Sequence, residues 1–325
     1  VVSGDAVFVT GARGFIGRAV AGRYRAQGRD VRGVDLAGAD DSDVGDGDIS
    51  REGPWQDAVA GCGVVVHTAA IVSNAASPDA AWAVNVLGTR HVLDAAVAAG
   101  AERVVVFSSA AVYSHRRDGL VTEQTPVRAG DTVYGDTKIA AENVAFQAHA
   151  SGEIDVTVLR PSDIYGPASR PWTILPVRNL RAGRVVLPAH GRGVFDPLYI
   201  DDLVDAVVAS AANADAAGQV INVGGGAPVP TAEFFGHYCR MLGIGPPRTA
   251  PTGVASALAG MVAGASRLLG RPSEITPATM RMLSGTGALA IDRARDLLGW
   301  EPRVDLADGM ARTEVWLREA GEIPG

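Results

Sequence analysis

The chain has 325 residues, 47% of them hydrophobic, and a net charge of -7 at pH 7. That size and composition fit one large domain or two interleaved domains with a full core, and exclude a small scaffold held by disulfides. An acidic balance without a basic block disfavours nucleic acids as partners.

Two cysteines, Cys62 and Cys239, stand far apart without the spacing of metal ligands. We therefore expect no structural disulfide, no metal site and a cytoplasmic location. No stretch has the pattern of a signal peptide or the length of a membrane span, so we expect neither.

Short apolar runs alternate with longer helical patterns through the first half of the chain. This alternation predicts an α/β fold with a doubly wound parallel Rossmann sheet. The expected strands are 6–10, 30–34, 64–67, 103–108 and 156–160, and the expected helices are 15–27, 54–60, 79–100 and 134–148.

After residue 160 the pattern is broken by proline and glycine. We expect a Rossmann domain at 1–160, rejoined by about 196–223, and a smaller mixed α/β substrate domain at 161–325. The Ala- and Gly-rich stretch 252–269 predicts a helix; core packing is favoured for it, with a lid or an interface as alternatives.

The first expected strand runs into Gly11, Gly14 and Gly17 at a strand-to-helix turn. Glycines there let the backbone approach a pyrophosphate at the helix N-terminus. Asp35 ends the second strand, where a carboxylate accepts hydrogen bonds from an adenosine ribose and repels a 2'-phosphate. The pattern favours NAD over NADP, and Arg13 is the one feature that favours NADP.

Lys138 is the only lysine in the chain, and Tyr134 stands four residues before it. In a helix these residues share one face, so a phenol and an ammonium meet at one site. The ammonium should lower the pKa of Tyr134 from its ordinary value of about 10 toward working pH. Tyr134 is thus the candidate general acid/base.

These motifs together resemble the extended short-chain dehydrogenase/reductase family over residues 6–317. The resemblance implies that the glycine loop, Asp35 and several later motifs hold the cofactor. The cofactor residues that it implies are Gly11, Arg13, Gly14, Phe15, Ile16, Gly17, Asp35, Asp48, Ile49, Thr68, Ala69, Ala70, Lys138, Pro161 and Ile164.

The resemblance also implies a catalytic set of Ser109, Tyr134 and Lys138. Ser109 would hold the substrate oxygen, Tyr134 would exchange its proton, and Lys138 would bind the nicotinamide ribose. Asn85 would support a water relay or the geometry of its helix.

Departures from the family pattern bear on the substrate. Nucleotide-sugar epimerases usually carry Asn at the position of Asp163 and Arg at that of Phe195, so a carboxylate and a phenyl ring replace groups that serve a diphosphate. Ala110 and Ala111 replace an acidic pair of the dehydratases. The candidate substrate residues are Ser73, Ala110, Tyr113, Asp163, Tyr165 and Phe195.

The C-terminal third is similar to the 3-beta-hydroxysteroid dehydrogenase-like branch. We therefore expect an NAD-dependent oxidoreductase that interconverts a secondary alcohol and a ketone on an apolar or non-phosphorylated substrate. The alternatives are an NAD-dependent nucleotide-sugar epimerase and a non-catalytic NAD-sensing protein. Helices 79–100 and 134–148 commonly pair across a dimer axis in this family, which predicts a homodimer.

Overall fold

One parallel seven-stranded sheet organises the first two thirds of the chain. The computed structural model describes residues 4–36, 43–73, 75–114, 118–270 and 273–324. The sheet has the order β12-β7-β5-β4-β1-β2-β3, which confirms the doubly wound fold. Its strands are β1 (Ala6–Thr10), β2 (Val31–Asp35), β3 (Val44–Asp46), β4 (Cys62–His67), β5 (Arg103–Phe107), β7 (Asp155–Pro161) and β12 (Val220–Val223).

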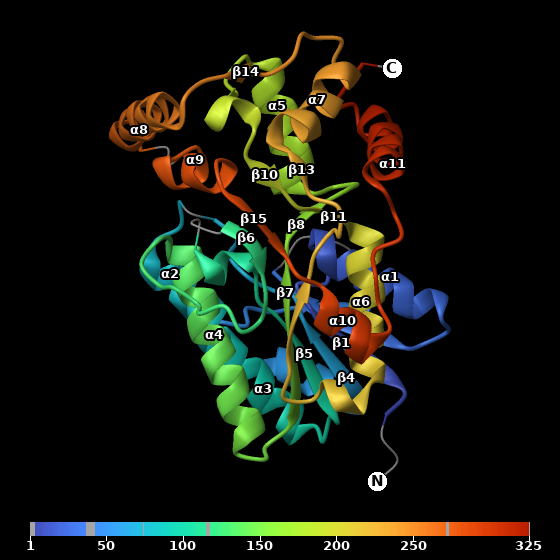
Figure 1. Ribbon diagram of the computed structural model, residues 1–325. Helices are drawn as coiled ribbons and strands as arrows, with labels where there is room; N and C mark the ends of the chain where they lie inside the picture. The colour runs from blue at the N-terminus through green and yellow to red at the C-terminus, as the bar shows by residue number, and fades with distance from the viewer. Residues whose placement is uncertain (1–3, 37–42, 74, 115–117, 271–272, 325) are drawn as a thin grey trace.

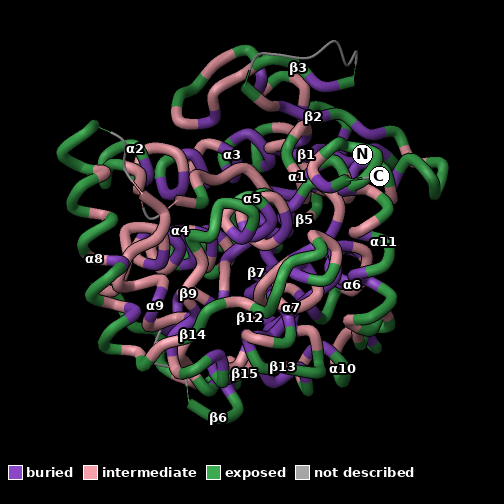
Figure 2. Tube along the Cα trace, turned by 90° about the horizontal axis from the view of Figure 1, so that it is seen from above, coloured by how far each residue is buried: buried purple, intermediate pink, exposed green. Residues whose placement is uncertain are grey.

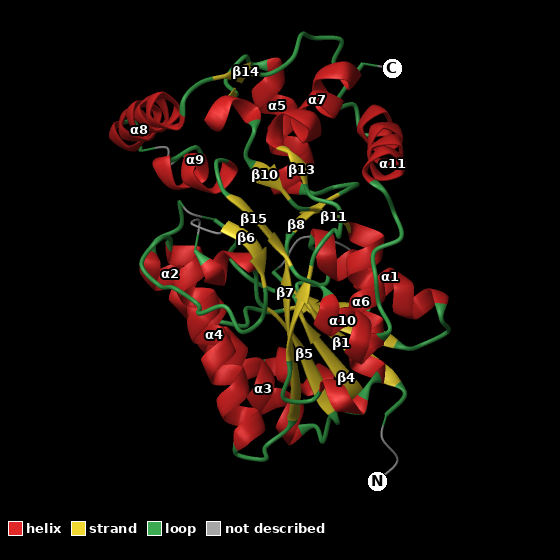
Figure 3. Ribbon diagram, in the orientation of Figure 1, coloured by secondary structure: helices red, strands yellow, loops and turns green. Residues whose placement is uncertain are grey.

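Helices cover both faces of this sheet, as the parallel order requires (Figures 1 and 3). On one face α1 packs against α6, and on the other α3 packs against α4. These helices are α1 (Phe15–Ala26), α6 (Ile200–Ala212), α3 (Gly88–Ala98) and α4 (Val133–Ala150), with α2 (Pro78–Trp82) preceding α3. A π-helical turn at 83–87 joins α2 to α3, so the single helix expected at 79–100 is interrupted there.

The register places the functional motifs at one edge. Thr10 at the end of β1 pairs with Val34 of β2 and with His67 of β4, and Phe107 of β5 pairs with Leu159 of β7. In an open parallel sheet ligands bind outside these carboxyl ends. The glycine loop, the residues after β4 and the residues after β5 therefore lie at the same edge.

The C-terminal region lies beyond this edge (Figure 1). One short strand pair, β15 with β6, joins it to the Rossmann part, and β11 pairs with β8 just beyond β7. Two more pairs, β10 with β13 and β14 with β9, lie within the C-terminal region itself. They are β6 (Asp118–Val121), β8 (Asp163–Tyr165), β9 (Val186–Leu187), β10 (Val194–Phe195), β11 (Pro197–Tyr199), β13 (Val229–Pro230), β14 (Arg248–Thr249) and β15 (Thr286–Leu289). The helices are α5 (Leu175–Arg181), α7 (Thr231–Met241), α8 (Thr252–Leu268), α9 (Pro277–Leu283), α10 (Asp292–Leu298) and α11 (Leu306–Glu319).

Residues 220–223 do return to the large sheet, where β12 pairs with β7. The domain limits at 160 and 161 stay a prediction. Some residues of the proposed domains lie outside the described part of the chain: 1–3, 37–42, 74, 115–117, 271–272 and 325.

The helix expected at 252–269 forms as α8, but the expectation of core packing is wrong. Only Ala255 and Ala259 of α8 are buried. Met261 and Leu268 keep 64% and 91% of their surface exposed, and Figure 2 shows α8 at the margin of the molecule. Its alanine stripe packs inward, while the larger apolar side chains face out.

Candidate active site

The glycines in the loop between β1 and α1 stand where a Cβ atom would collide with nearby backbone. Gly11 has φ +65°, and a Cβ atom added to it would lie 2.9 Å from Cα and N of Ala69. A Cβ at Gly17 would lie 2.0 Å from the Gly11 carbonyl oxygen. Gly14 is the N-cap of α1, without a capping side chain and without an acidic residue in the first turn. The first amides of α1 can therefore receive an anion.

Asp35 lies at the end of β2, in contact with this loop. Its carboxylate accepts hydrogen bonds from the main-chain amides of Arg13 (2.8 Å) and Leu36 (2.7 Å). The Arg13 guanidinium donates to the carbonyl oxygens of Leu36 and Val44 and to the carboxylate of Asp46. Arg13 is thus bound along β2 and β3, which weakens the one argument for NADP.

The other residues expected along the cofactor differ in exposure. Ile49 and Pro161 are buried, whereas the side chains at positions 15, 16, 48, 68, 69, 70 and 164 are partly exposed. The Thr68 hydroxyl donates to the carbonyl oxygen of Thr10 at 2.7 Å. Hydrogen bonds from Ser50 lower the pKa of Asp48. Ile49 packs against Gly88, the first residue of α3: a Cβ atom added to Gly88 would lie 2.9 Å from the Cδ1 atom of Ile49.

The catalytic candidates come from the end of β5 and the first turns of α4. Ser109 follows β5, and its side chain lies close enough to the Tyr134 phenol to lower the pKa of that group. Lys138 is buried and donates from Nζ to the carbonyl oxygen of Phe107 at 2.7 Å. Thr132 caps α4 by accepting a hydrogen bond from the Gly135 amide, which fixes where the Tyr134 turn begins. The structure thus brings Ser109, Tyr134 and Lys138 together.

Burial controls the ionisation of these groups. It raises the pKa of Tyr134 to about 12, while the Ser109 hydrogen bond opposes the rise. Burial also lowers the pKa of Lys138 to about 8, opposed by the charge of Glu142. The expectation that the pKa of Tyr134 is lowered toward working pH is therefore wrong for this structure, because desolvation of the phenolate outweighs the opposing effect of Ser109.

Asn85 is held by hydrogen bonds between two segments of the site. Its amide group exchanges two hydrogen bonds with the main chain of Ile71, at 2.8 and 3.1 Å, and donates to the Thr137 hydroxyl at 2.9 Å. Thr137 in turn donates to the carbonyl oxygen of Tyr134. Asn85 therefore ties the loop after β4 to the turn of α4 that carries Tyr134.

A buried histidine extends this network to the glycine loop. His67 lies 2.7 Å from the Thr10 hydroxyl through Nδ1 and 3.0 Å from the Thr89 hydroxyl through Nε2. Because Thr89 donates to the carbonyl oxygen of Asn85, it accepts from His67, which assigns the proton to Nε2. Burial lowers the pKa of His67 to about 3, with Lys138 adding to the effect. The sequence pattern predicts that the residues after His67 contact the cofactor. It does not predict that His67 itself links Thr10 to Thr89.

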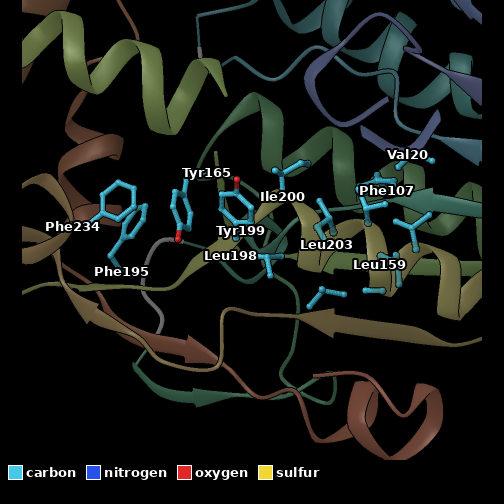
Figure 4. Packing of buried hydrophobic residues seen from close by; sticks show 14 of the residues in the cluster. Val20, Phe107, Leu159, Tyr165, Phe195, Leu198, Tyr199, Ile200, Leu203 and Phe234 are labelled. Atoms are coloured by element: carbon cyan, nitrogen blue, oxygen red, sulfur yellow. The ribbon is translucent and has the colours of Figure 1, made fainter. Parts of the chain in front are cut away.

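Three candidate substrate residues lie in the core instead of at a cleft. Tyr113 is 3% exposed, and its hydroxyl bonds to Asn222 and Arg160. Tyr165 and Phe195, each 1% exposed, belong to an aromatic cluster around Phe234 that Figure 4 shows. Their side chains pack within the core, and their expected contact with a substrate stays a prediction.

The other three occupy different positions. Ala110 is buried, Asp163 is partly exposed, and Ser73 donates to the Glu274 carboxylate at 2.6 Å. The last contact joins the loop after β4 to the segment before α9. Glu274 was not expected, and a lone glutamate in a proline-rich segment gave no signal for it.

Two further residues near the site were missed by sequence reasoning. Glu142 and Arg160 form a buried ion pair behind Lys138. The spacing of Tyr134, Lys138 and Glu142 at i, i+4 and i+8 was a signal that could have placed Glu142 on the catalytic face of the helix. Across the described residues, no group of three or more His, Cys, Asp or Glu side chains is arranged to hold a metal ion.

Comparison with known proteins decides the family. Residues 7–224 match the family described as NAD dependent epimerase/dehydratase. The chain belongs to this family. The expected resemblance to extended short-chain dehydrogenases/reductases is confirmed.

Relatives within the family have different activities. A 3-diazoavenalumate denitrifying reductase of Streptomyces sp is 34% identical, over 94% of this chain and 99% of that protein. A 3beta-hydroxysteroid-dehydrogenase/decarboxylase of Arabidopsis thaliana is 30% identical over 79% of this chain, which spans 48% of that longer protein. MoeE5 in complex with UDP-glucuronic acid and NAD has 28% identity and a TM-score of 0.78, with 97% of this chain and 99% of that chain covered.

The family's cofactor fits the residues that are present. The glycines at 11, 14 and 17 let the loop pack tightly on its own backbone and on the residues after β4, directly before the uncapped end of α1, whose first amides can receive an anion. Asp35 stands at the end of β2, beside that loop, and its carboxylate is held by the Arg13 amide.

None of the helices that the structure describes combines the length and apolarity needed to cross a membrane.

Proposed function

We propose that the protein is an NAD-dependent oxidoreductase that interconverts a secondary alcohol and a ketone. The observation that carries the proposal is that the Tyr134 phenol lies beside Ser109, which lowers its pKa, and 6.0 Å from the buried ammonium nitrogen of Lys138, measured to the ring centroid. This arrangement holds a phenol, a hydroxyl and a cation around the position where a substrate oxygen would bind. It stands at the same sheet edge as the glycine loop.

In this mechanism the protein residues handle the proton and the orientation. NAD would be held by the glycine loop, Asp35 and Lys138, and it supplies the carbon that accepts or donates hydride. Ser109 positions the substrate oxygen, and Tyr134 gives or takes its proton. Its raised pKa keeps Tyr134 protonated at neutral pH, which suits it as the acid in ketone reduction. Lys138 stabilises the phenolate that remains.

The proposed substrate is apolar or at least not a sugar nucleotide. Phe195 stands at the position where the epimerases carry an arginine, and it packs 4.8 Å from Trp172 and 4.1 Å from Phe234 between ring centroids. Burial of this ring leaves no cation there for a diphosphate. The 3-diazoavenalumate denitrifying reductase and the 3beta-hydroxysteroid-dehydrogenase/decarboxylase are likewise not named for a nucleotide sugar, whereas two dTDP-glucose 4,6-dehydratases of Streptomyces, 31% identical, are.

A nucleotide-sugar epimerase is the second candidate. The family contains epimerases, and MoeE5 holds UDP-glucuronic acid on a chain of similar fold. Such an enzyme would use the same Tyr134 but would retain its NAD through the cycle. The two candidates differ in net production of NADH.

One titration series tests the proposal. Purified protein would be mixed with NAD, NADP, UDP, UDP-glucose and a steroid alcohol such as pregnenolone, first by thermal shift and then by nicotinamide absorbance. We expect stabilisation by NAD, no response to UDP, and absorbance at the NADH band with an apolar alcohol. Strong stabilisation by UDP without net NADH would replace the dehydrogenase by the epimerase.

We also propose a homodimer. Trp82 and Leu87 are each 48% exposed at the α2–α3 junction, and α3 packs beside α4. Large exposed apolar side chains on neighbouring helices suit a subunit contact. Sedimentation should give a dimer for the wild type and a monomer for Leu87→Glu; a monomeric wild type would contradict the proposal. The cytoplasmic location stays a prediction.

A further inference from the structure

Three consecutive residues at the end of β5 meet one face of α4. The carbonyl oxygen of Phe107 accepts a hydrogen bond from Lys138, Ser108 donates one to Glu142, and Ser109 lies beside Tyr134 and lowers its pKa. The three partners on α4 follow one another at intervals of four residues, so they form a single stripe along the helix. Two members of this stripe are the proposed catalytic residues, and the third is Glu142.

Glu142 is also clamped from β7. Arg160 donates from Nε to Oε1 at 2.7 Å and from Nη2 to Oε2 at 2.6 Å, a bidentate pair. Both side chains are only 6% exposed. A buried pair of this kind costs desolvation and is weak evidence for stability, so its presence directly behind Lys138 calls for another explanation.

The charges around Lys138 can be named element by element. On α4 it faces Glu142 and Tyr134, on β5 the carbonyl oxygen of Phe107, and on β4 the neutral His67. Glu142 itself faces Ser108 of β5 and Arg160 of β7. Arg160 continues to the hydroxyl of Tyr113, which it approaches at 2.7 Å. Glu142 is therefore the carboxylate that faces the lysine within this buried set.

We propose that the Glu142–Arg160 pair is a positioning unit of the active site. It fixes the catalytic stripe of α4 against the ends of β5 and β7, and its balanced charge sets the electrostatic surroundings in which Lys138 holds its proton. The catalytic part of this role rests on the proposed function. The local charge effect on Lys138 does not, and it can be measured without a substrate.

The two halves of the pair should act in opposite directions. Glu142→Gln leaves the Arg160 guanidinium uncompensated, which disfavours the ammonium of Lys138. Arg160→Gln leaves the Glu142 carboxylate uncompensated, which favours it. If the pair had only a structural role, both variants would lose stability, but the pKa of Lys138 would not shift in opposite directions in the two.

Because Lys138 is the only lysine, labelling with lysine enriched in 13C at Cε gives one signal from a chain with a lysine-free tag. Its chemical shift would be followed against pH. We expect a midpoint near 8 in the wild type. The midpoint should fall by about one pH unit or more in Glu142→Gln and rise by a similar amount in Arg160→Gln.

Two further variants serve as controls for misfolding and for net charge. Removing one partner of a buried pair can prevent folding, so the double variant Glu142→Gln with Arg160→Gln replaces the pair by neutral amides and should have a midpoint between those of the single variants. Glu153→Gln, which removes a partly exposed carboxylate just beyond α4, is the matched charge control and should leave the midpoint unchanged. Circular dichroism would verify the fold of each.

The outcomes separate the two proposals. If the Lys138 midpoint stays at its wild-type value in the folded variants, the positioning unit is overturned even in an active dehydrogenase. Absence of turnover with NAD and any alcohol overturns the proposed function even when the midpoints move as expected. In an active enzyme, the pH at which kcat/KM falls on the alkaline side should follow the same order of variants.

Discussion

Lys138 lies one helical turn beyond Tyr134, with its ammonium nitrogen 6.0 Å from the centroid of the phenol ring. The two groups belong to one face of α4, and burial moves their pKa values in opposite directions, to about 12 for Tyr134 and about 8 for Lys138. Both groups consequently carry a proton at neutral pH. This is the state from which the phenol can act as an acid.

Tyr134→Phe should lower turnover by at least about a hundredfold, because it removes only the proton that is transferred. Binding of NAD should remain nearly intact. Initial rates and an NAD titration by calorimetry would measure both. Tyr24→Phe is a matched control, since the Tyr24 hydroxyl lies on α1 and is buried without a hydrogen-bond partner among the residues that the structure describes. Turnover like that of the wild type in Tyr134→Phe would remove Tyr134 from the mechanism.

Asp35→Ala should narrow the preference for NAD over NADP. The variant removes the carboxylate that repels a 2'-phosphate, together with its hydrogen bonds to the amides of Arg13 and Leu36. The ratio of dissociation constants for the two cofactors is the measurement. Asp30→Ala, an exposed carboxylate before β2 that pairs with Arg32, controls for net charge. An unchanged ratio would mean that another residue reads the ribose.

Acid should destabilise the protein through His67. Its pKa is about 3 in the fold, against an ordinary 6.5. The unfolded chain therefore binds the proton more readily, so the contribution of neutral His67 is complete above about pH 6.5 and is lost as the pH falls toward 3. Between pH 6.5 and 4.5 the loss is about 2 to 3 kcal/mol in free energy of unfolding.

Urea unfolding at these two pH values would measure the effect. His67→Gln cannot titrate and should show a smaller loss than the wild type. His190→Asn is a suitable control, because His190 is exposed with φ 55° and asparagine tolerates this conformation. Equal losses in wild type and His67→Gln would show that His67 is not the group responsible.

Much of this site follows from local pattern. The glycine loop, Asp35 and the Tyr134–Lys138 pair are set by spacing within single elements, and β1 and α4 form where apolar and helical periodicity place them. A parallel sheet then brings the strand ends together without further information. These features were predictable because each depends on residues close in the sequence.

The rest depends on contacts between distant segments. Glu142 meets Arg160, and His67 meets Thr10, only after β4, β5, β7 and α4 have packed. Burial of Tyr134 likewise reverses the pKa shift that its lysine neighbour suggests. Spacing along one chain gives no measure of desolvation, so the sequence pattern located the catalytic pair but not its ionisation.

The buried position of Phe195 changes what a substitution there should do. Sequence reasoning treats Phe195→Arg as a way to restore a phosphate ligand. In the structure the ring is fully buried within the aromatic cluster of Trp172 and Phe234 (Figure 4), so the variant places an unpaired charge in the core. We expect it to lose more than about 4 kcal/mol of unfolding free energy.

Thermal and urea unfolding would test this expectation. Phe195→Leu keeps the site apolar and should cost about 1.5 kcal/mol. Val315→Arg, on α11 and 57% exposed, adds the same charge at the surface and should change the stability by less than about 0.5 kcal/mol. If Phe195→Arg is as stable as the wild type, its side chain reaches solvent or a ligand cleft, and binding of UDP-glucose by that variant becomes the deciding measurement.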